Sequence, residues 1–453
     1  MSETSRGLSR PDWETFINAH ELTHVGVGCV DWEGRLRSKQ YASEKILASA
    51  QLPITSAVFT GDPVEQPITT LALEDPANGY PDALINLDEA VGFKFPFDHG
   101  GDGLIMLGCI TGDLADHCPR SMLQKELGRW QRIDRQVRGA FEIESYLLRE
   151  TTRSMAGKSP EALCFSEAFA RMMSFIEQSD ASEFLNSLTS CCEVMGIKIR
   201  AVHGEHLRLL ETALAPAQGV TICDHALLYK SIAKIVARRQ HILASFMAQA
   251  SAAAESAGAH LNLSFADGIG RSTLVDGDDL LLSDEGRFFI GGLQRYLPEL
   301  MVCLAPNINS YKRFVPPNIS PLNNTWDYEN KTAAYRVAGS GADRRIEIRV
   351  PGADTHPYLA LTAVLTAGRR GIGERAEPSA PSAGNAWSDS APSGPPWPRD
   401  LSAAVSAWRG SALAKSTFGA SFVEAYALTR EWQLAAFARA VTDWELQTYA
   451  YNA

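Results

Sequence analysis

Six side chains along this sequence have the chemistry of ligands for divalent metal ions. They are five glutamates and one histidine: Glu142, Glu144, Glu205, Glu211, His260 and Glu347. Five carboxylates that converge without a cation repel one another and raise one another's pKa values, and hard divalent cations remove that repulsion. Oxygen ligands suit Mg²⁺ or Mn²⁺, so the set taken together predicts a site for one of these metals. Taken singly, each residue has a simpler interpretation, such as a surface helix position for Glu211 or a hydrogen-bonded core position for His260.

Period-two alternation predicts the strands that must position these side chains. Glu142 and Glu144 lie two residues apart in a strand expected over 137–148, so both carboxylates point to one face. His260 begins the segment HLNLS (260–264), in which polar residues alternate with leucines. We therefore expect these three side chains on the polar faces of β-strands.

The segment RRIEIRVPGADTHPY (344–358) shows the same alternation with more charge. Arg345, Glu347 and Arg349 alternate with aliphatic residues, which is the pattern of a strand with one charged face. Two arginines that flank a glutamate on one face are costly to cover unless an anionic or metallic group lies there. On this stretch alone, a solvated sheet face is an equally good interpretation.

The composition is that of a globular protein of 453 residues, with 45% hydrophobic and 21% charged residues. The net charge of −11 argues against general nucleic-acid binding, although a local basic cluster can still bind an anionic substrate. No apolar run has the roughly 18 residues of a membrane span, and the N-terminus lacks the apolar core of a signal peptide. The eight cysteines show no CxxC spacing and are interpreted as reduced thiols, so a cytoplasmic location is expected.

The chain is long enough for two or three domains, and we place the first at residues 13–117. Its pattern is α+β, with a hairpin expected over 23–39 and another strand over 104–113. A boundary follows near Cys118, Pro119 and Arg120, after which helical patterns become frequent.

Amphipathic helices are expected after this boundary, over 179–196 and 223–240. Ser182 and Asp224 are the predicted caps of these two helices. Residues 375–398 are rich in Pro, Ser, Gly and Ala, which predicts an exposed loop, and helical pattern resumes from residue 400 to the end.

The order of four motifs resembles the catalytic domain of the glutamine synthetase family. The motifs are NSYKRFVPP (309–317), WDYENKTAAYRV (326–337), the strand over 344–358, and PYLALTAVLTAG (357–368). The resemblance implies a two-domain α+β fold, with a small N-terminal β-grasp-like domain (13–117) and a large catalytic domain (118–453) built on a curved antiparallel sheet. It also implies a homo-oligomer, a dodecamer of two hexameric rings with active sites between subunits.

The resemblance implies a reaction and a role for each site residue. In the family, ATP phosphorylates the side-chain carboxylate of glutamate, and an amine displaces phosphate to leave an amide. Carried over, one metal ion would be held by Glu144, Glu205 and Glu211, and the other by Glu142, His260 and Glu347. The substrate and nucleotide residues would be Arg313 for the α-carboxylate, Arg349 for the side-chain carboxylate, Arg336 for the ATP phosphates, Lys331 where the family usually has an arginine, and Ser264 near the nucleotide.

Several positions depart from the glutamine-forming members of the family. Ile319 stands where a flap glutamate closes over the acyl phosphate, and no DGSS motif, with its ammonium-binding aspartate, is found. The second histidine of the family's HxH is Asn262, and the asparagine–glycine of the glutamate-binding loop reads Glu255-Ser256. Glu205 and Glu211 are only six residues apart, which is shorter than usual.

The loss of both ammonium-binding carboxylates favours a larger amine with a hydrocarbon part, because Ile319 supplies apolar surface instead of charge. Together with Trp326 and Glu255, this pattern resembles the γ-glutamylpolyamine synthetase branch and related γ-glutamylamide ligases. The predicted function is therefore an ATP-dependent ligase of glutamate and a polyamine, alkylamine or arylamine. Ordinary glutamine synthesis and a catalytically silent regulatory oligomer are the alternatives.

Overall fold

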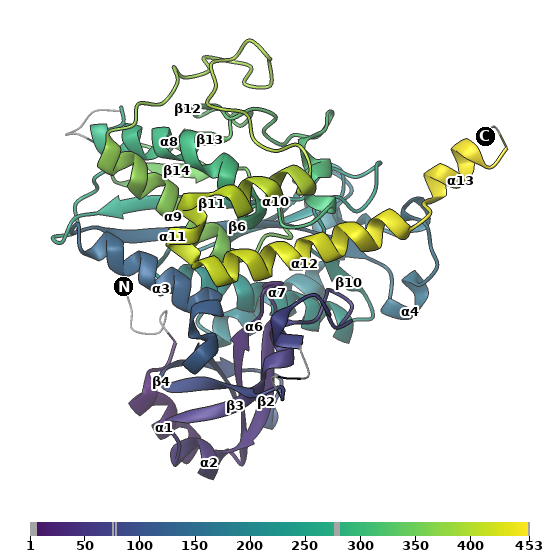
Figure 1. Cartoon of the computed structure of the whole chain (residues 1–453). Helices are drawn as coiled ribbons and strands as arrows, with labels where there is room; N and C mark the ends of the chain where they lie inside the picture. The colour runs from purple at the N-terminus through teal and green to yellow at the C-terminus, as the bar shows by residue number, and fades with distance from the viewer. Residues whose placement is uncertain (1–6, 75–76, 78, 276–280, 452–453) are drawn as a thin grey trace.

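The computed structural model describes residues 7–74, 77, 79–275 and 281–451. Figure 1 shows a smaller N-terminal part below a larger body formed by the rest of the chain. Each part is built on its own β-sheet. This mixture of helices and sheets agrees with the predicted α+β class.

A five-stranded sheet with the order β2-β1-β5-β4-β3 forms the N-terminal part. Its elements are α1 (Arg10–Ala19), β1 (His24–Val30), β2 (Leu36–Ala42), α2 (Ser43–Leu47), β3 (Gln51–Thr55), β4 (Asp82–Phe95) and β5 (Gly103–Thr111). The predicted hairpin is present as the antiparallel pair β1–β2, whereas β1 and β5 run parallel. The alternating residues Val25, Val27 and Cys29 of β1 are all buried in the core, as period-two packing requires.

A nine-stranded sheet forms the centre of the larger body, with the order β12-β13-β14-β11-β6-β8-β7 and with β9 and β10 paired to β6. Its strands are β6 (Gln136–Leu148), β7 (Ile199–Glu205), β8 (Leu209–Leu214), β9 (Ala217–Gln218), β10 (Leu243–Ser245), β11 (Ala259–Ala266), β12 (Trp326–Tyr328), β13 (Tyr335–Ala338) and β14 (Arg345–Ile348). The long strand β6 pairs with β8, β9, β10 and β11. It therefore positions side chains from several distant parts of the sequence.

Helices cover one face of this sheet. They include α3 (Pro119–Gln131), α6 (Ser182–Val194), α7 (Thr221–Arg239), α8 (Asp284–Tyr296) and α9 (Pro357–Glu374). Trp130 of α3 stacks on Phe265 of β11 with 4.6 Å between ring centroids, and Tyr229 of α7 donates a hydrogen bond to Thr212 of β8 at 2.7 Å. Phe141 of β6 is buried on this helix-covered side, which leaves the opposite face of the sheet for polar side chains.

The two predicted helix caps are wrong. Helix α7 begins at Thr221, so Asp224 lies inside its first turn, where it is buried and accepts hydrogen bonds from Arg120 at 3.0 and 2.9 Å. The carboxylate of Asp224 is bound by the guanidinium group of Arg120 through two charge-assisted hydrogen bonds, which together are stronger than a single bond to a backbone N–H at a helix end. In α6 the N-cap is Ala181, and Ser182 is the first helical residue.

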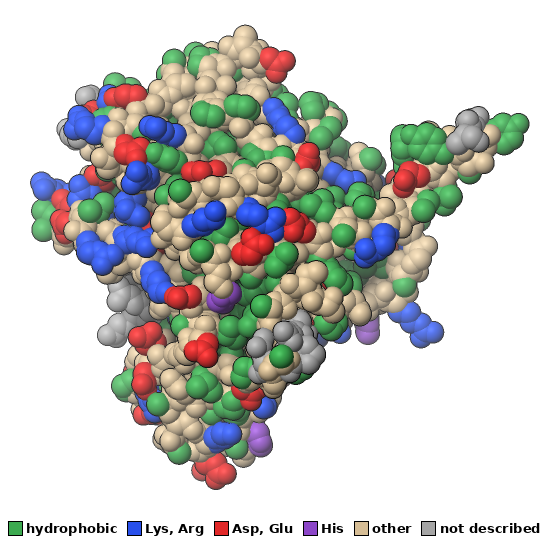
Figure 2. Space-filling model, in the orientation of Figure 1, with side chains coloured by type: hydrophobic (Ala, Val, Ile, Leu, Met, Phe, Trp, Pro, Cys, Tyr) green, Lys and Arg blue, Asp and Glu red, His purple; other side chains and the backbone are tan. Residues whose placement is uncertain are grey.

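The remaining helices lie outside the two sheets. They are α4 (Thr152–Met155), α5 (Phe175–Asp180), α10 (Leu401–Gly410), α11 (Ala412–Phe418), α12 (Ala420–Arg439) and α13 (Asp443–Tyr449). The loop predicted over 375–398 is present between α9 and α10, although Trp397 within it is buried. Helix α13 projects away from the body at the end of α12, and Figure 2 shows apolar side chains along this arm. Among the described helices, none has both the length and the apolar character of a membrane span.

Candidate active site

The centre of the candidate site is the face of β6 that carries Glu142 and Glu144. In the register of the sheet, Glu142 lies opposite His260 of β11, and Glu144 lies opposite Glu211 of β8. Cross-strand partners lie within about 5.5 Å of each other, so three carboxylates and an imidazole share a small area. The sequence places these residues up to 118 positions apart, and pairing with β6 brings them together.

Burial and mutual repulsion raise the pKa values of these carboxyl groups. The pKa of Glu211 is raised to about 9 by burial and by the charges of Glu144, Glu142 and Glu205. Burial also raises the pKa of Glu142, with a further contribution from Glu347, and burial raises the pKa of Glu144. The cluster therefore has a deficit of positive charge, which a divalent cation would correct.

His260 is suited to bind a metal through a neutral ring. Burial lowers its pKa well below the ordinary value, and the positive charges of Arg349 and Arg313 act in the same direction. Its Nδ1 lies 3.7 Å from Oε1 of Glu347. An unprotonated imidazole among carboxylates is a donor set that fits Mg²⁺ or, better, Mn²⁺.

Two groups of ligand atoms are close enough to share an ion. Oxygen or nitrogen atoms of Glu142, Glu211 and His260 lie within 4.8 Å of one another, and so do those of His203, Glu205 and Glu211. Glu205 and Glu211 are only six residues apart because a short connection joins the antiparallel strands β7 and β8, and this pairing brings the two carboxylates close together.

The other two predicted ligands are held by different contacts. Glu144 accepts a hydrogen bond from the backbone N–H of Gly258, and Glu347 lies between two arginines. Arg336 Nη1 lies 2.8 Å from Oε2 of Glu347, and Arg349 Nη1 lies 2.5 Å from its Oε1. Glu347 therefore lies next to the candidate ligand His260, and its charge is neutralised by the two guanidinium groups.

The strand β14 explains this arrangement of charges. Arg336 of β13 and Glu347 are cross-strand partners, and Arg349 follows on the same side two residues later. Arg345, the third charged residue of the alternation, turns to Asn262 and donates to its Oδ1 at 2.9 Å. The charged face is thus not a solvated sheet face, because Glu347 and Arg349 are both buried.

Arg313 lies next to the same cluster, in the short 3₁₀ helix Asn309–Phe314. It is buried, and its Nη1 donates to the carbonyl of Val350 at 2.7 Å. Burial lowers the pKa of its guanidinium group. Within the described part of the chain, the buried Nε atoms of Arg313, Arg336 and Arg349 have no hydrogen-bond partner. Such groups can bind anionic oxygens.

Lys331 and Ser264 lie at the edge of the cluster. Lys331 is exposed, and its charge contributes to lowering the pKa values of both Glu205 and His260. The larger cause for Glu205 is its hydrogen bond with His203, at 2.9 Å. Ser264 is partly buried on β11, opposite Arg138 of β6 and on the same face as His260.

Sequence reasoning missed two polar residues of the site. His203 lies two positions before Glu205 on β7, and this period-two spacing was a signal that both side chains share one face. Glu255 was noted as a departure in the glutamate-binding loop and as part of the branch resemblance, but no role was assigned to it; its carboxylate accepts a hydrogen bond from the backbone N–H of Ile319 at 2.9 Å.

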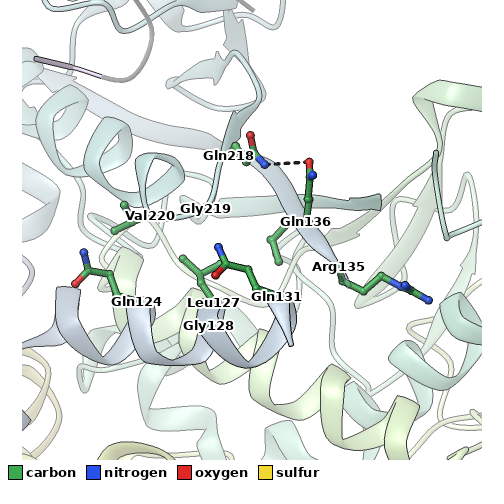
Figure 3. Close-up of a pocket in the computed structure, with 10 residues that line it drawn as sticks. Gln124, Leu127, Gly128, Gln131, Arg135, Gln136, Gln218, Gly219 and Val220 are labelled. Carbon is green, nitrogen blue, oxygen red and sulfur yellow. Dashed lines mark hydrogen bonds between the residues drawn. The ribbon is translucent and has the colours of Figure 1, made fainter. Parts of the chain in front are cut away.

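A separate cavity of about 240 Å³ lies beyond the beginning of β6, between α3 and the turn after β9. Figure 3 shows side chains of Gln124 and Gln131 at this cavity, and the hydrogen bond from Gln218 to Gln136 at 3.1 Å. None of the predicted metal, substrate or nucleotide residues lines it. The candidate active site is therefore defined by the carboxylates and arginines rather than by this cavity.

Several known proteins resemble this chain in sequence and in structure. A glutamate–isopropylamine ligase of a Pseudomonas species is 27% identical over 96% of both chains. A gamma-glutamylethanolamide synthetase of Streptomyces coelicolor is 29% identical over 99% of this chain and 96% of its own length. A structure described as ligand-free GmaS superimposes with a TM-score of 0.81 and covers 97% of this chain and 99% of its own, at 20% identity. Residues 116–449 match the family model described as the glutamine synthetase catalytic domain, and the chain therefore belongs to the glutamine synthetase family.

Proposed function

We propose that this protein is an ATP-dependent ligase that forms a γ-glutamyl amide from glutamate and an amine other than ammonia. Family membership supports the carbon–nitrogen ligase chemistry. The two relatives of nearly full length are named for isopropylamine and for an ethanolamide, which supports the choice of a substituted amine. Ordinary glutamine synthesis is the competing function, and it differs from the proposed one in using ammonia as the amine.

One observation carries this proposal: carboxylates with raised pKa values lie beside buried arginines whose Nε–H groups have no hydrogen-bond partner among the described residues. Glu142 and Glu211 represent the first group, and Arg313 and Arg349 the second. A site with room for cations on one side and for anionic oxygens on the other suits phosphoryl transfer to a carboxylate. A silent homologue would have no physical reason to keep this costly arrangement.

Each residue then has a proposed role. Two divalent ions, Mg²⁺ or Mn²⁺, would neutralise the migrating phosphoryl group when bound with ATP. We assign one ion to Glu144, Glu205 and Glu211, and the other to Glu142, His260 and Glu347. Arg313 binds the α-carboxylate of glutamate, Arg349 its side-chain carboxylate, Arg336 and Lys331 the ATP phosphates, and Ser264 lies near the nucleotide. Glu347 holds Arg336 and Arg349 in place before the substrates arrive, which lowers the cost of ordering them.

The proposal extends to the assembly. Residues 13–117 form a β-grasp-like domain, residues 118–453 form the catalytic domain with its curved antiparallel sheet, and the chains assemble as a dodecamer of two hexameric rings. The projecting arm of α13 supports an oligomer, since Trp444 is 62% exposed and Leu446 is 55% exposed. Apolar groups exposed together on a protruding helix are typical of contacts between proteins.

The test is a direct screen with the purified protein, ATP, Mg²⁺, glutamate and a panel of amines. The panel contains ammonia, isopropylamine, ethanolamine, putrescine and aniline, and the readouts are phosphate release and the mass of the amide product. We expect amide formation with at least one substituted amine at a higher kcat/KM than with ammonia. Fastest turnover with ammonia would identify a glutamine synthetase, and no phosphate release with any amine would identify a silent homologue.

A further inference from the structure

Glu255 joins the loop before β11 to the segment that contains Ile319, which we call the flap segment (residues 315–321). The residue is buried, with 8% of its surface exposed. Its Oε1 accepts hydrogen bonds from the backbone N–H of Ile319 at 2.9 Å and from that of Ser256 at 3.1 Å. Beside this contact, the hydroxyl of Ser256 lies 2.9 Å from that of Ser320. Two adjacent pairs of residues therefore hold the flap segment against the loop.

The same loop reaches the centre of the candidate site three residues later. Gly258 donates its backbone N–H to the carboxylate of Glu144. A Cβ atom on Gly258 would lie 2.7 Å from Nε2 of His260 and 3.0 Å from Nη2 of Arg313, so the close approach requires glycine. Three residues of chain span at most about 11 Å. Glu255 thus lies within the length of a small substrate from the proposed metal and glutamate-binding residues.

Among the described residues, one oxygen of Glu255 accepts no hydrogen bond and is available for a further contact. Oε1 is used by the two backbone N–H groups, whereas Oε2 lies 3.9 Å from Nδ1 of His206, beyond hydrogen-bond distance. A carboxylate oxygen has two lone pairs and accepts readily from an ammonium group. Tyr146 donates its hydroxyl to the carbonyl of Glu255 at 2.6 Å, which fixes the backbone from which the side chain extends.

We propose that Glu255 binds the ammonium group of the amine substrate and accepts a proton from it, an inference that rests on the proposed ligase function. The amine arrives as R–NH₃⁺ and gives one proton to the Glu255 carboxylate. The freed lone pair on nitrogen forms a bond to the γ-carbonyl carbon of the acyl phosphate, and the bond from that carbon to the phosphate oxygen breaks. The leaving phosphate takes the electron pair and the second proton, and the neutral amide remains.

This role accounts for the absence of a glutamate at position 319. The flap segment supplies a backbone N–H that orients a carboxylate from another loop, instead of carrying the carboxylate itself. The side chain of Ile319 is 42% exposed and provides apolar surface next to that carboxylate. The pair fits an amine that has a charged end and a hydrocarbon part, and it fits an alkylamine better than an arylamine.

The test uses Glu255→Gln with two amines of similar size, methylamine and hydroxylamine. Methylamine is protonated at neutral pH, and hydroxylamine is largely neutral. The glutamine keeps a carbonyl oxygen that can accept from Ile319 and Ser256, but it can neither hold nor deprotonate a cation. We expect kcat/KM for methylamine to fall by about 10²- to 10⁴-fold. For hydroxylamine we expect a loss below about tenfold, because no proton has to be removed before attack.

Ser320→Ala is the matched control, since it weakens the neighbouring contact between the loop and the flap segment without touching the carboxylate. It should lower the rates with both amines by the same factor. If Glu255→Gln also lowers both rates equally, Glu255 only fastens the flap segment and the proposal is overturned. If the unchanged protein folds normally but forms no product with these two amines or with any amine of the panel above, the ligase function itself fails.

Discussion

Glu144 and Glu211 are direct cross-strand partners on β6 and β8, so two carboxylates occupy a pair of positions where like charges are destabilising. The pKa of Glu211 is accordingly raised to about 9, through burial and through the charges of Glu144, Glu142 and Glu205. Without a metal, one of these groups retains a proton at neutral pH. A divalent ion replaces that proton, which couples metal binding to pH and to stability.

Stability without metal should therefore depend on pH. Glu211 binds a proton up to about pH 9 in the folded chain but only up to about pH 4.3 when unfolded. Between these values the folded state holds more protons, so stability decreases as pH rises. We expect Tm in EDTA to decrease from pH 5.5 to 9 and to decrease less in excess Mg²⁺. Glu211→Gln should flatten the EDTA curve, and identical slopes for both proteins would contradict the assignment.

Glu347 should be essential for turnover. Its replacement by glutamine keeps one oxygen that can accept from either Arg336 or Arg349, but it removes the charge proposed to bind metal beside His260. We expect kcat to decrease by more than about 100-fold, with a higher Mg²⁺ requirement. Glu329→Gln is the control, because Glu329 lies 2.7 Å from Arg336 but is exposed. Near-normal activity of Glu347→Gln at low Mg²⁺ would exclude Glu347 as a ligand.

Arg313→Lys should weaken glutamate binding specifically. A lysine is a point charge and cannot replace the fork of a guanidinium group that binds a carboxylate. Charge-assisted hydrogen bonds contribute about 1.5–3 kcal/mol, so the KM for glutamate should rise by about 10- to 100-fold. Arg369→Lys, at the ion pair with Glu126 between α3 and α9, should leave that KM unchanged. A change confined to the KM for ATP would show that Arg313 binds the nucleotide instead.

The projecting arm should be required for assembly. Trp444 and Leu446 of α13 are exposed in the single chain, so a charged residue at either position costs little unless a partner covers them. We expect Leu446→Asp to shift the mass measured by light scattering to smaller species, with Tm of the isolated chain nearly unchanged. Thr448→Asp, on the same helix, is the control. An unchanged mass for Leu446→Asp would place the subunit contacts elsewhere.

The strands of the site could be predicted from sequence because their side-chain period is two. The alternation around Glu142 predicted β6 close to its observed bounds, and the alternation around Glu347 predicted β14, which ends at Ile348 and is shorter than the charged segment. What alternation could not predict is register. Only the pairing of β6 with β8 and β11 shows that Glu144 faces Glu211 and that Glu142 faces His260.

Loops limited the prediction of the site for a different reason. Glu255 and Ile319 lie in segments without periodicity, and their contact is formed by a backbone N–H, which every residue except proline carries. Asp224 was mistaken for a helix cap because its partner Arg120 lies 104 residues away, and no local pattern encodes that ion pair. The sequence shows which side chains at these positions are charged or apolar, but only the folded structure shows which residues they contact.

Ile319→Glu tests the choice of amine. The backbone N–H of Ile319 already binds the carboxylate of Glu255, so a glutamate at position 319 would place a second negative charge beside the first. Two carboxylates attract the small ammonium ion strongly and exclude hydrocarbon groups by charge and by loss of apolar surface. We expect the ratio of ammonia turnover to alkylamine turnover to rise by more than about tenfold, measured as kcat/KM for both amines.

The uncharged variant Ile319→Gln separates charge from shape in this experiment. If charge attracts ammonium, Ile319→Glu should gain activity with ammonia while Ile319→Gln should not, although both lose the apolar surface that favours an alkylamine. If both variants lose activity with every amine alike, Ile319 is a packed residue of the flap segment with no part in amine choice. If the unchanged protein already turns over ammonia faster than any other amine, the proposed role of Ile319 is wrong. The apolar side chain at position 319 would then not favour an alkylamine over ammonia.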